Sequence, residues 1–392
     1  MEDLKAKVIQ AVDEISAELL DVARKIHAHP ELAFEERYAA DLLCTTLENH
    51  GLKPQRGAFD LETSFRCDIG DEGPVLAILS EYDALPEMGH ACGHNLIAAM
   101  GLGAALALAK VGGFRGKIRY LGTPAEEYGA GKAVMAARGA FDGLDAAMMV
   151  HPAGVDLEAY PTLCVTAVKA TFHGKPAHAS LAPDQGINAL DACVSAYQNI
   201  AQLRQHMDMV ARVHGIITNG GAAPNIVPER AEATYFLRAR DEGSLESLKG
   251  RVRACIEAGA LGAGATVDLE WWEYPYLNLR SNQSLAKSYR TNAESLGRMF
   301  FPVSAIPMHV RGSTDMGNVS QIVPSIHPTI TVAPPTVGIH TACFAHCAAS
   351  ETGDKGTLDG AKAMAMTAID FFSSAELRAA VARDFKSGAG MV

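Results

Sequence analysis

The stretch from Ser80 to Asn95 constrains this chain more than any other, because it places reactive side chains between a strand and a helix. An apolar run at 75–79 precedes it and predicts a buried strand, and small apolar residues up to about Lys110 predict a long helix after it. The stretch holds three carboxylates, two histidines and one cysteine. Because ligands bind at the carboxyl ends of strands in open α/β sheets, we expect a metal site here.

The same alternation of strand and helix continues beyond this stretch. A strand predicted at 117–121 runs into the adjacent pair Glu126 and Glu127, and a strand predicted at 146–150 ends at His151. Three strands therefore lead into clusters of His, Glu or Asp, with helices expected between them. This order predicts an α/β layer whose site lies along one edge of the sheet.

The N-terminal segment has helical periodicity. Apolar residues at helical spacing over 3–28 predict one amphipathic helix that ends before Pro30. A second helix is expected over 34–50, because Gly51 is a normal C-terminal signal.

Near residue 163 the pattern changes and predicts a second domain. The expected elements are a strand at 163–172, a helix at 186–207, strands at 213–219 and 230–239, a helix at 244–258 and a strand at 265–273. This β-α-β-β-α-β order is the ferredoxin-like arrangement. We therefore expect an inserted domain at 165–279 within an α/β domain made of 1–164 and 280–392.

Composition excludes several classes of protein. The chain has 392 residues, enough for two domains, and its 48% hydrophobic and 20% charged residues are typical of a globular protein. A formal net charge of −11, with no basic run, argues against binding nucleic acid.

Membrane insertion and disulfide bonding are also not expected. The N-terminus is charged and amphipathic, unlike a signal peptide, and the apolar stretch at 96–109 is broken by glycine and too short to span a bilayer. Eight cysteines in a chain of this size are best explained as reduced thiols, which predicts a cytoplasmic protein without membrane partners.

Several side chains at the predicted strand ends could bind metal together. Their mixture of thiol, imidazole and carboxylate suits Zn²⁺, and shared carboxylates also allow Mn²⁺ or Co²⁺. They are Cys92, His94, Glu126, Glu127, His151 and His340. Of the two adjacent glutamates, one could bind metal while the other acts as a general base. The pair could equally be a solvated acidic pair at a helix start.

Each other candidate has a structural alternative when it is taken singly. Cys92 could be a small buried apolar residue, His151 an exposed strand end, and His340 a turn residue. Their joint placement favours a site. Cys343 and Cys347 flank His346, but no second Cys/His pair completes a zinc site there.

Two other patterns have simpler explanations. The glycines Gly101 and Gly103 follow no phosphate-loop spacing, so close helix packing explains them better. The chain lacks a Gly-x-Ser-x-Gly motif, which argues against a serine hydrolase.

A series of short motifs runs through nearly the whole chain in a fixed order. It comprises HAHPELAFEE at 27–36, DALP at 83–86, HACGH at 90–94, the pair Glu126–Glu127, His151–Pro152, GKPAHAS at 174–180, NIVPE at 225–229 and GIHT at 338–341. As a set they resemble the di-metal peptidase and amidohydrolase family. This family includes aminoacylases, glutamate carboxypeptidases, indole-acetyl-amino-acid hydrolases and p-aminobenzoyl-glutamate hydrolase. The chain is most similar to its aminoacylase-like dipeptidase subgroup.

The resemblance implies a particular architecture and cofactor. The fold would be a zinc-peptidase-like three-layer α/β/α catalytic domain with an inserted ferredoxin-like α+β domain, which acts as a lid and forms a homodimer. One or two divalent ions would bind per subunit, either Zn²⁺ or Mn²⁺, with Co²⁺ as a further option. The implied metal ligands are Cys92, His94, Glu127, His151 and His340.

Roles for the remaining site residues also follow from the resemblance alone. Glu126 would be the general base that takes a proton from a metal-activated water and passes it to the leaving amine. His178 would stabilise the oxyanion in a neighbouring subunit's site, and Asn225 would hold the substrate carboxylate or carbonyl. Asp83 would support catalysis by orienting a metal ligand.

Two departures from the usual family pattern lie in the opening stretch. Asn95 stands where many members have aspartate, and Glu81-Tyr82-Asp83 replaces His-x-Asp or Asp-x-Asp. Both changes resemble the dipeptidase subgroup, and they leave open whether Glu81 contacts a metal.

We therefore predict a metal-dependent amidohydrolase that cleaves the amide bond of an N-acyl amino acid or a dipeptide. Arg311 and Arg280 are candidates for holding the substrate carboxylate, although an ordinary surface role explains either one more simply.

Two other functions are weighed beside this one. One is hydrolysis of p-aminobenzoyl-glutamate or a related aryl amide, weakly indicated by Trp271, Trp272 and Tyr274. The other is a non-catalytic binding protein on the same fold, which loss of Glu126 or of several ligands would indicate; neither loss has occurred.

Overall fold

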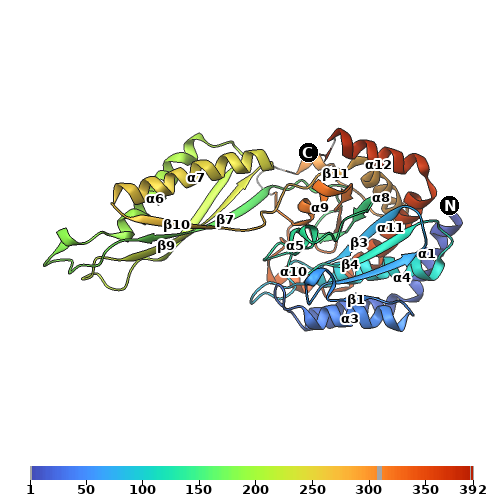
Figure 1. Cartoon of the computed structure of the whole chain (residues 1–392). Coiled ribbons are helices and arrows are strands. Elements are labelled where there is room, and N and C mark those ends of the chain that lie inside the picture. The colour runs from blue at the N-terminus through green and yellow to red at the C-terminus, as the bar shows by residue number, and fades with distance from the viewer. Residues whose placement is uncertain (1, 307–310, 389, 392) are drawn as a thin grey trace. The chain divides into compact units, whose positions relative to one another are not determined.

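The computed structural model describes residues 2–306, 311–388 and 390–391, and the chain divides into two compact units (Figure 1). Unit 1 comprises Met1–Pro161 and Leu279–Val392, and unit 2 comprises Thr162–Asn278. The predicted boundaries fell after residues 164 and 279, against 161 and 278 in this division.

Unit 1 is built on an eight-stranded sheet. In spatial order its strands are β1 (Gln55–Arg56), β2 (Phe65–Gly70), β4 (Lys117–Gly122), β3 (Val75–Ser80), β5 (Ala146–Met148), β12 (Ser325–Ile326), β11 (Ser281–Asn282) and β14 (Gly390–Met391). The inner strands from β4 to β11 run parallel to one another, whereas β1, β2 and β14 pair antiparallel. A separate parallel pair joins β6 (His151–Ala153) to β13 (Thr329–Thr331).

Helices pack on this sheet and on one another. They are α1 (Glu2–Glu14), α2 (Ser16–Ala28), α3 (Arg37–Asn49), α4 (His94–Val111), α5 (Gly131–Ala137), α8 (Gln283–Ser295), α9 (Met316–Ile322), α10 (Ala342–Cys347), α11 (Glu351–Ser373) and α12 (Ala375–Ser387), with 3₁₀ turns at Ala58–Asp60 and Val303–Ala305.

Two predictions for the N-terminal helices were wrong in detail. The single helix expected over 3–28 is two helices, because Ile15 leaves helical geometry with ψ near 8°. The helix expected over 34–50 begins only at Arg37, because Phe34 has a positive φ of 64° that no α-helix contains.

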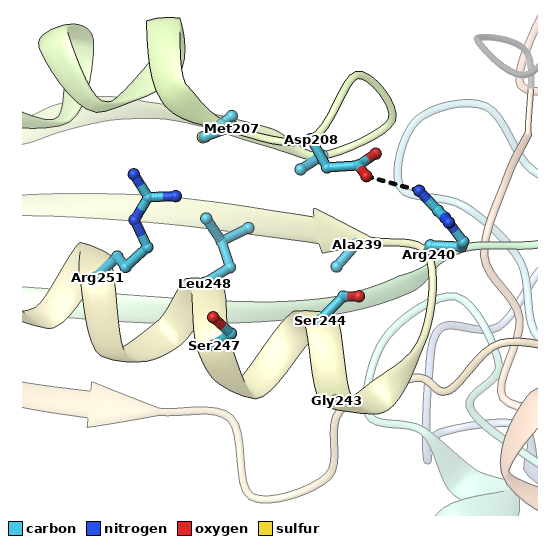
Figure 2. A pocket seen from close by; sticks show the side chains of 10 residues that line it. Met207, Asp208, Ala239, Arg240, Gly243, Ser244, Ser247, Leu248 and Arg251 are labelled. Carbon is cyan, nitrogen blue, oxygen red and sulfur yellow. Dashed lines mark hydrogen bonds and ion pairs between the residues drawn. The ribbon is translucent and has the colours of Figure 1, made fainter.

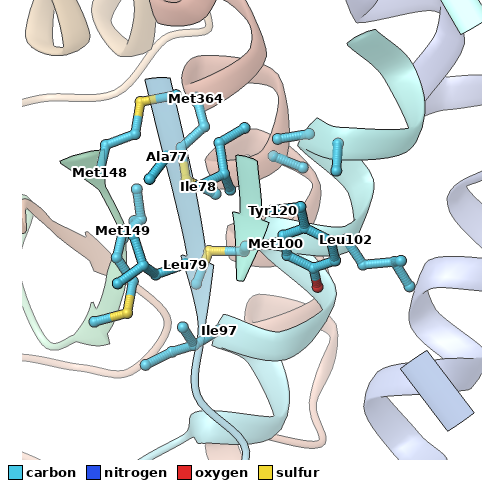
Figure 3. Packing of buried hydrophobic residues seen from close by; sticks show 14 of the residues in the cluster. Ala77, Ile78, Leu79, Ile97, Met100, Leu102, Tyr120, Met148, Met149 and Met364 are labelled. Carbon is cyan, nitrogen blue, oxygen red and sulfur yellow. The ribbon is translucent and has the colours of Figure 1, made fainter. Parts of the chain in front are cut away.

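Helix α4 lies at the centre of the unit 1 core. It is 18 residues long with a mean hydropathy of 1.4, which is apolar enough to cross a membrane, but 83% of it is buried inside the fold, as in a core helix. Figure 3 shows Ile97 and Met100 of α4 beside Leu79 of β3 and Tyr120 of β4. The predicted close packing at the glycines is confirmed, since a Cβ on Gly101 would lie 2.1 Å from Ser80 Oγ.

Unit 2 has the predicted ferredoxin-like order. Its elements are β7 (Cys164–His173), α6 (Ala189–Leu203), β8 (Arg212–Asn219), β9 (Arg230–Ala239), α7 (Glu242–Gly262) and β10 (Thr266–Trp271), with 3₁₀ turns at Pro183–Gln185 and Arg204–His206. The sheet order β10-β7-β9-β8 is antiparallel throughout and has its own apolar core. The predicted fold class, an α/β domain with an inserted α+β domain, is confirmed.

The helix predicted over 186–207 is shorter than expected. It begins at Ala189 because the Asn188 side chain accepts hydrogen bonds from the amides of Leu190 and Asp191 and so caps the first turn. It ends at Leu203, and the chain continues as a 3₁₀ turn.

The parallel strands of unit 1 bring the reactive segments to one edge of the sheet. Strands β3, β4 and β5 end at Ser80, Gly122 and Met148, and each is followed by a loop that carries candidate site residues. The strand predicted at 146–150 is interrupted after Met148, and His151 instead begins β6. This arrangement is expected where ligands bind an α/β sheet.

Replacing Gly101 by Ala should destabilise the protein by about 1–3 kcal/mol, because the new methyl group overpacks the contact between α4 and β3. The matched control is Gly250→Ala in α7, where a Cβ would meet nothing within 4 Å and helix propensity should improve. Urea unfolding followed by circular dichroism measures both changes. Equal stability of the two variants would contradict close packing at Gly101.

Candidate metal centre

Five side chains predicted as metal ligands converge in unit 1. Cys92 and His94 follow β3, Glu127 follows β4, His151 begins β6, and His340 precedes α10. Possible ligand atoms of Cys92, His94 and His151 lie within 4.8 Å of one another, and so do those of Cys92, Glu127 and His340. Cys92 therefore belongs to both groups.

The individual distances describe a compact cluster. Cys92 Sγ lies 3.5 Å from His151 Nε2, and His340 Nε2 lies 3.4 Å from Glu127 Oε1. His94 Nε2 lies 3.8 Å from Glu127 Oε1. The side chain of His340 is 45% exposed, whereas the other four are buried or nearly so, so the cluster reaches solvent at His340.

Asp83 orients this cluster through two contacts. Its Oδ1 and its backbone carbonyl each lie 2.9 Å from His94 Nδ1, which directs Nε2 of the same ring into the cluster. Its Oδ2 accepts a hydrogen bond of 2.8 Å from the Glu127 amide. The predicted orienting residue therefore contacts two of the predicted ligand residues at once.

Backbone contacts hold the two outer histidines. His151 Nδ1 lies 2.7 Å from the Pro152 carbonyl, so that Nε2 faces Cys92. His340 has a φ of 61°, and its amide donates to the carbonyl of Ala91 at 2.8 Å, next to Cys92. Each ring thus presents one nitrogen to the cluster.

Burial shifts the pKa values of the possible metal ligands in this cluster. Burial, reinforced by Glu127, raises the pKa of the Cys92 thiol well above its usual value. Burial and the nearby charge of His94 lower the pKa of His151 to about 4, so the ring is neutral at pH 7. A neutral imidazole is the form that binds metal.

The donor set fits a divalent cation. His94 Nε2 and Glu127 Oε1 are buried and have no hydrogen-bond partner in the part of the chain that the structure describes. Unpaired buried polar atoms are costly and rare in folded proteins. Sulfur, nitrogen and oxygen donors in one cluster match the preferences of Zn²⁺, with Mn²⁺ and Co²⁺ also compatible. The residues present therefore fit the predicted metal.

Glu126 lies beside this cluster. Its Oε2 is 3.9 Å from His94 Nε2, and ligand atoms of Glu81, His94 and Glu126 lie within 4.8 Å of one another. Burial, followed by the charges of Glu81 and Glu127, raises the pKa of the Glu126 carboxyl well above its usual value. A carboxyl group with a raised pKa can both accept and return a proton near neutral pH.

A buried ion triad was not predicted from the sequence. Lys132 Nζ lies 2.7 Å from Glu81 Oε2 and 2.7 Å from Asp315 Oδ1, and the Lys132 amide donates to Asp315 Oδ2 at 2.8 Å. All three side chains are fully buried. One oxygen of Glu81 is thus engaged by an ammonium group. The available signal was a lone lysine within the small-residue segment that forms α5.

Two further buried polar residues were also missed. Glu36 is fully buried and accepts a hydrogen bond of 2.8 Å from the Ala125 amide. His327 is buried with its ring centroid 5.4 Å from that of His151. Glu36 belongs to the HAHPELAFEE motif, so the family resemblance marked its segment but not its role.

The predicted substrate-binding residues lie in different units. His178 and Asn225 are exposed in unit 2 on neighbouring segments, since the Ala179 amide donates to the Asn225 carbonyl at 3.0 Å. Arg311 lies in unit 1, where its Nε is buried without a hydrogen-bond partner among the described residues. Arg280 instead packs 5.4 Å over the Phe385 ring, as an ordinary structural arginine does.

Other residues from the sequence analysis have structural roles or none that the structure shows. His90 is buried and Glu87 lies in a turn with a φ of 61°. Trp271 lies under Lys249 and Trp272 packs on Phe236, both within unit 2. In the described part of the chain, the segment with Cys343, His346 and Cys347 forms no group with metal-binding geometry.

A pocket of about 350 Å³ in unit 2 contains none of the predicted site residues (Figure 2). It lies at the N-terminal end of α7, and an ion pair of 2.6 Å joins Asp208 to Arg240 beside it. Of its two arginines, Arg240 is paired with Asp208, and Arg251 donates a hydrogen bond of 2.9 Å to the His206 carbonyl, so the pocket does not indicate an anion site.

The chain is similar in sequence to known peptidases and amide hydrolases. The profile of a family described as "Peptidase dimerisation domain" matches residues 165–263. The chain is 39% identical to the Xaa-Arg dipeptidase of Mus musculus, over 98% of this chain and 93% of that protein. It is 34% identical to one of the subunits of p-aminobenzoyl-glutamate hydrolase from Escherichia coli K12, over 68% of this chain and 60% of that protein.

A solved structure shares the fold. A dinuclear metal-binding peptidase of the M20 family from Bacillus subtilis superposes with a TM-score of 0.71 at 21% identity, covering 92% of this chain and 99% of that one.

Replacing Lys132 by Met should lower the free energy of unfolding by about 3–5 kcal/mol, because Glu81 and Asp315 would lose their shared buried cation. The matched control is Lys110→Met, which removes an exposed ion pair with Glu14 and should have a much smaller effect. Chemical denaturation at pH 7 measures both. Similar stability of the two variants would show that the triad contributes little.

Proposed function

Because this chain belongs to the M20 peptidase family and hydrolyses amide bonds with a divalent metal, we propose that its substrate is a dipeptide with a basic C-terminal residue. The observation that supports metal-dependent amide hydrolysis is the convergence of five potential ligands next to Glu126. The similarity to Xaa-Arg dipeptidases, which extends over 98% of the chain, favours this substrate class. An N-acyl amino acid has the same amide bond and carboxylate and is the second candidate.

Hydrolysis of an aryl-glutamate amide is less well supported. The similarity to p-aminobenzoyl-glutamate hydrolase covers only 68% of the chain. Trp271 and Trp272, which weakly indicated an aryl site, pack against residues of their own unit. A non-catalytic binding protein is also disfavoured, because the ligand set and Glu126 are all present.

Cys92, His94, Glu127, His151 and His340 would hold one or two divalent ions. When bound, a divalent ion lowers the pKa of water and polarises the carbonyl of the substrate. His94 Nε2 and Glu127 Oε1, which are buried and form no hydrogen bond among the described residues, support this assignment. Asp83 keeps the His94 ring in place from the opposite nitrogen.

Glu126 would move the proton. Its carboxylate accepts a proton from the attacking water, and the same group returns it to the nitrogen of the leaving amine when the amide bond breaks. Burial and the carboxylates around Glu126 raise its pKa, which increases its affinity for the transferred proton. The cluster reaches solvent at His340, so water can enter there.

Arg311 would bind the substrate carboxylate. Its guanidinium can form a bidentate contact, and its Nε has no partner among the described residues. Tyr160 accepts a hydrogen bond of 3.2 Å from the Gly312 amide, and its pKa is raised by burial and also affected by the charges of Cys92 and Arg311, which supports a position of Arg311 close to the cluster. His178 and Asn225 would contact the substrate from exposed loops, an assignment that rests on the family resemblance.

The chain would act as a homodimer in the cytoplasm. Unit 2 matches a dimerisation domain, and its edge strand β8 exposes 66% of Ile216 and 39% of Ile217. An apolar strand edge is a ready surface for pairing with a second copy. The cytoplasmic assignment rests on the eight free cysteines.

A hydrolysis panel tests the substrate class. Protein loaded with Zn²⁺ or Mn²⁺ is incubated with Xaa-Arg and Xaa-Lys dipeptides, N-acetyl amino acids and p-aminobenzoyl-glutamate, and the released amines are measured. We expect the basic dipeptides to have the highest kcat/KM. Preference for the aryl amide would overturn the proposal, and chelation should abolish all turnover.

Glu126→Gln should lower kcat by about 100-fold to 10,000-fold, because the amide cannot accept the proton. Its metal content, measured by elemental analysis, should stay close to that of the wild type. Glu127→Gln is the matched control, which should lose metal as well as activity. If Glu126→Gln loses metal and Glu127→Gln keeps it, the two roles are exchanged.

Ile216→Lys should convert the dimer to a monomer, because a charge on the β8 edge opposes burial of that edge. Size-exclusion chromatography with light scattering measures the mass. Leu261→Lys, at a residue of α7 that is 81% exposed, is the control and should leave the mass unchanged. A dimeric Ile216→Lys variant would place the interface elsewhere.

A further inference from the structure

The residue before Glu126 has an unusual backbone conformation. Ala125 has a φ of 60°, in the left-handed region that a Cβ makes sterically unfavourable. Residues in such conformations persist only when the surrounding structure holds them. The turn that presents Glu126 therefore needs specific support from its neighbours.

Two buried carboxyl groups supply this support on either side of Glu126. The Ala125 amide donates to Glu36 Oε1 at 2.8 Å, and the Glu127 amide donates to Asp83 Oδ2 at 2.8 Å. The Ala125 carbonyl accepts from the Gly131 amide at 3.1 Å. The backbone of the turn is thus held at both residues that flank Glu126.

Burial of the Glu36 carboxyl group is energetically unfavourable, although the group supplies a hydrogen-bond acceptor to the Ala125 amide. The side chain is fully buried, and its Oε2 has no hydrogen-bond partner within the described ranges. Burial, followed by the charge of Asp83, raises the pKa of its carboxyl to about 7. The charge of Glu36 in turn contributes, after burial, to the raised pKa of Tyr82.

We propose that Glu36 is a positioning residue, which holds Ala125 in its left-handed conformation and thereby aims the Glu126 carboxylate at the attacking water. The inference rests on the proposed role of Glu126. Among the described residues no hydrogen bond joins Glu36 to a predicted ligand; it acts through the Ala125 amide. Because a displacement of about 1 Å can slow an enzyme by about 100-fold, a single backbone contact here has a large effect on rate.

The first test compares two substitutions at the same position. Glu36→Gln keeps an oxygen that accepts from the Ala125 amide, so kcat should stay within about three-fold of the wild type. Glu36→Leu removes the acceptor, and kcat should fall about 10-fold to 100-fold with KM and metal content little changed. Equal kcat values for the two variants would overturn the proposal.

A second substitution separates positioning from general damage to the fold. In the Glu36→Leu background, Ala125→Gly should restore part of the lost kcat, because glycine adopts a positive φ without support. Ala130→Gly is the matched control, since Ala130 also has a positive φ, of 52°, but its amide is not bound by Glu36. Rescue by both glycines, or by neither, would contradict the proposed contact.

A readout without substrate keeps this test separate from the proposed function. The Ala125 amide should exchange its hydrogen faster in Glu36→Leu than in the wild type or Glu36→Gln, as measured by mass spectrometry of the peptide that contains it. Unchanged exchange would overturn the contact even in an active enzyme. A wild-type protein that hydrolyses no substrate would overturn the function of Glu126 instead.

The pH dependence of stability gives a further readout. The folded carboxyl of Glu36, with a pKa of about 7, binds its proton more tightly than the unfolded one near 4.5. Its contribution to stability is therefore full below pH 4.5 and is lost as the pH rises to about 7. Glutamine does not ionise, so Glu36→Gln should not lose stability as the pH rises. The free energy of unfolding of Glu36→Gln minus that of the wild type should therefore increase between pH 4.5 and about pH 7. A difference that stays constant over this range would contradict the raised pKa of Glu36.

Discussion

Buried negative charge is the constraint on which the rest of unit 1 depends. Glu81, Asp83, Glu126 and Asp315 are all buried at one edge of the sheet, where an isolated carboxylate is strongly destabilising. Lys132 neutralises part of this charge from within the chain. The remainder is balanced by protonation, as the raised pKa of Glu126 indicates, or by a divalent ion held in the adjoining cluster.

The two kinds of compensation have different consequences. Lys132 is covalently part of α5, so its two ion pairs join α5 to the segment after β3 and to the start of α9 whether or not metal is present. A metal ion, in contrast, stabilises the folded state only while it is bound. The triad therefore supports the loops around the candidate metal centre independently of any bound ion.

The sequence could predict the fold and the convergence of the candidate ligand side chains because both follow from local patterns. Alternating strands and helices indicate the α/β class, and the motif around Cys92 and His94 indicates a candidate metal site. The triad could not be predicted in this way, since Lys132 and Asp315 are 183 residues apart and neither lies in a recognisable motif. The Glu36 contact with Ala125 spans 89 residues and depends on one φ angle, which sequence periodicity does not report.

Asp83 connects metal binding to the placement of the base. One of its oxygens contacts the His94 ring, and the other accepts from the Glu127 amide, directly after Glu126. Asp83 therefore links a candidate ligand to the turn through a single buried side chain. Glu36 supports the same turn from the other end, and no hydrogen bond joins it to the candidate ligands in the described part of the chain. The turn thus has one support that contacts a candidate ligand and one that is hydrogen-bonded to the Ala125 amide, so a change at His94 would act on the turn through Asp83 and leave the Glu36 contact to hold Ala125.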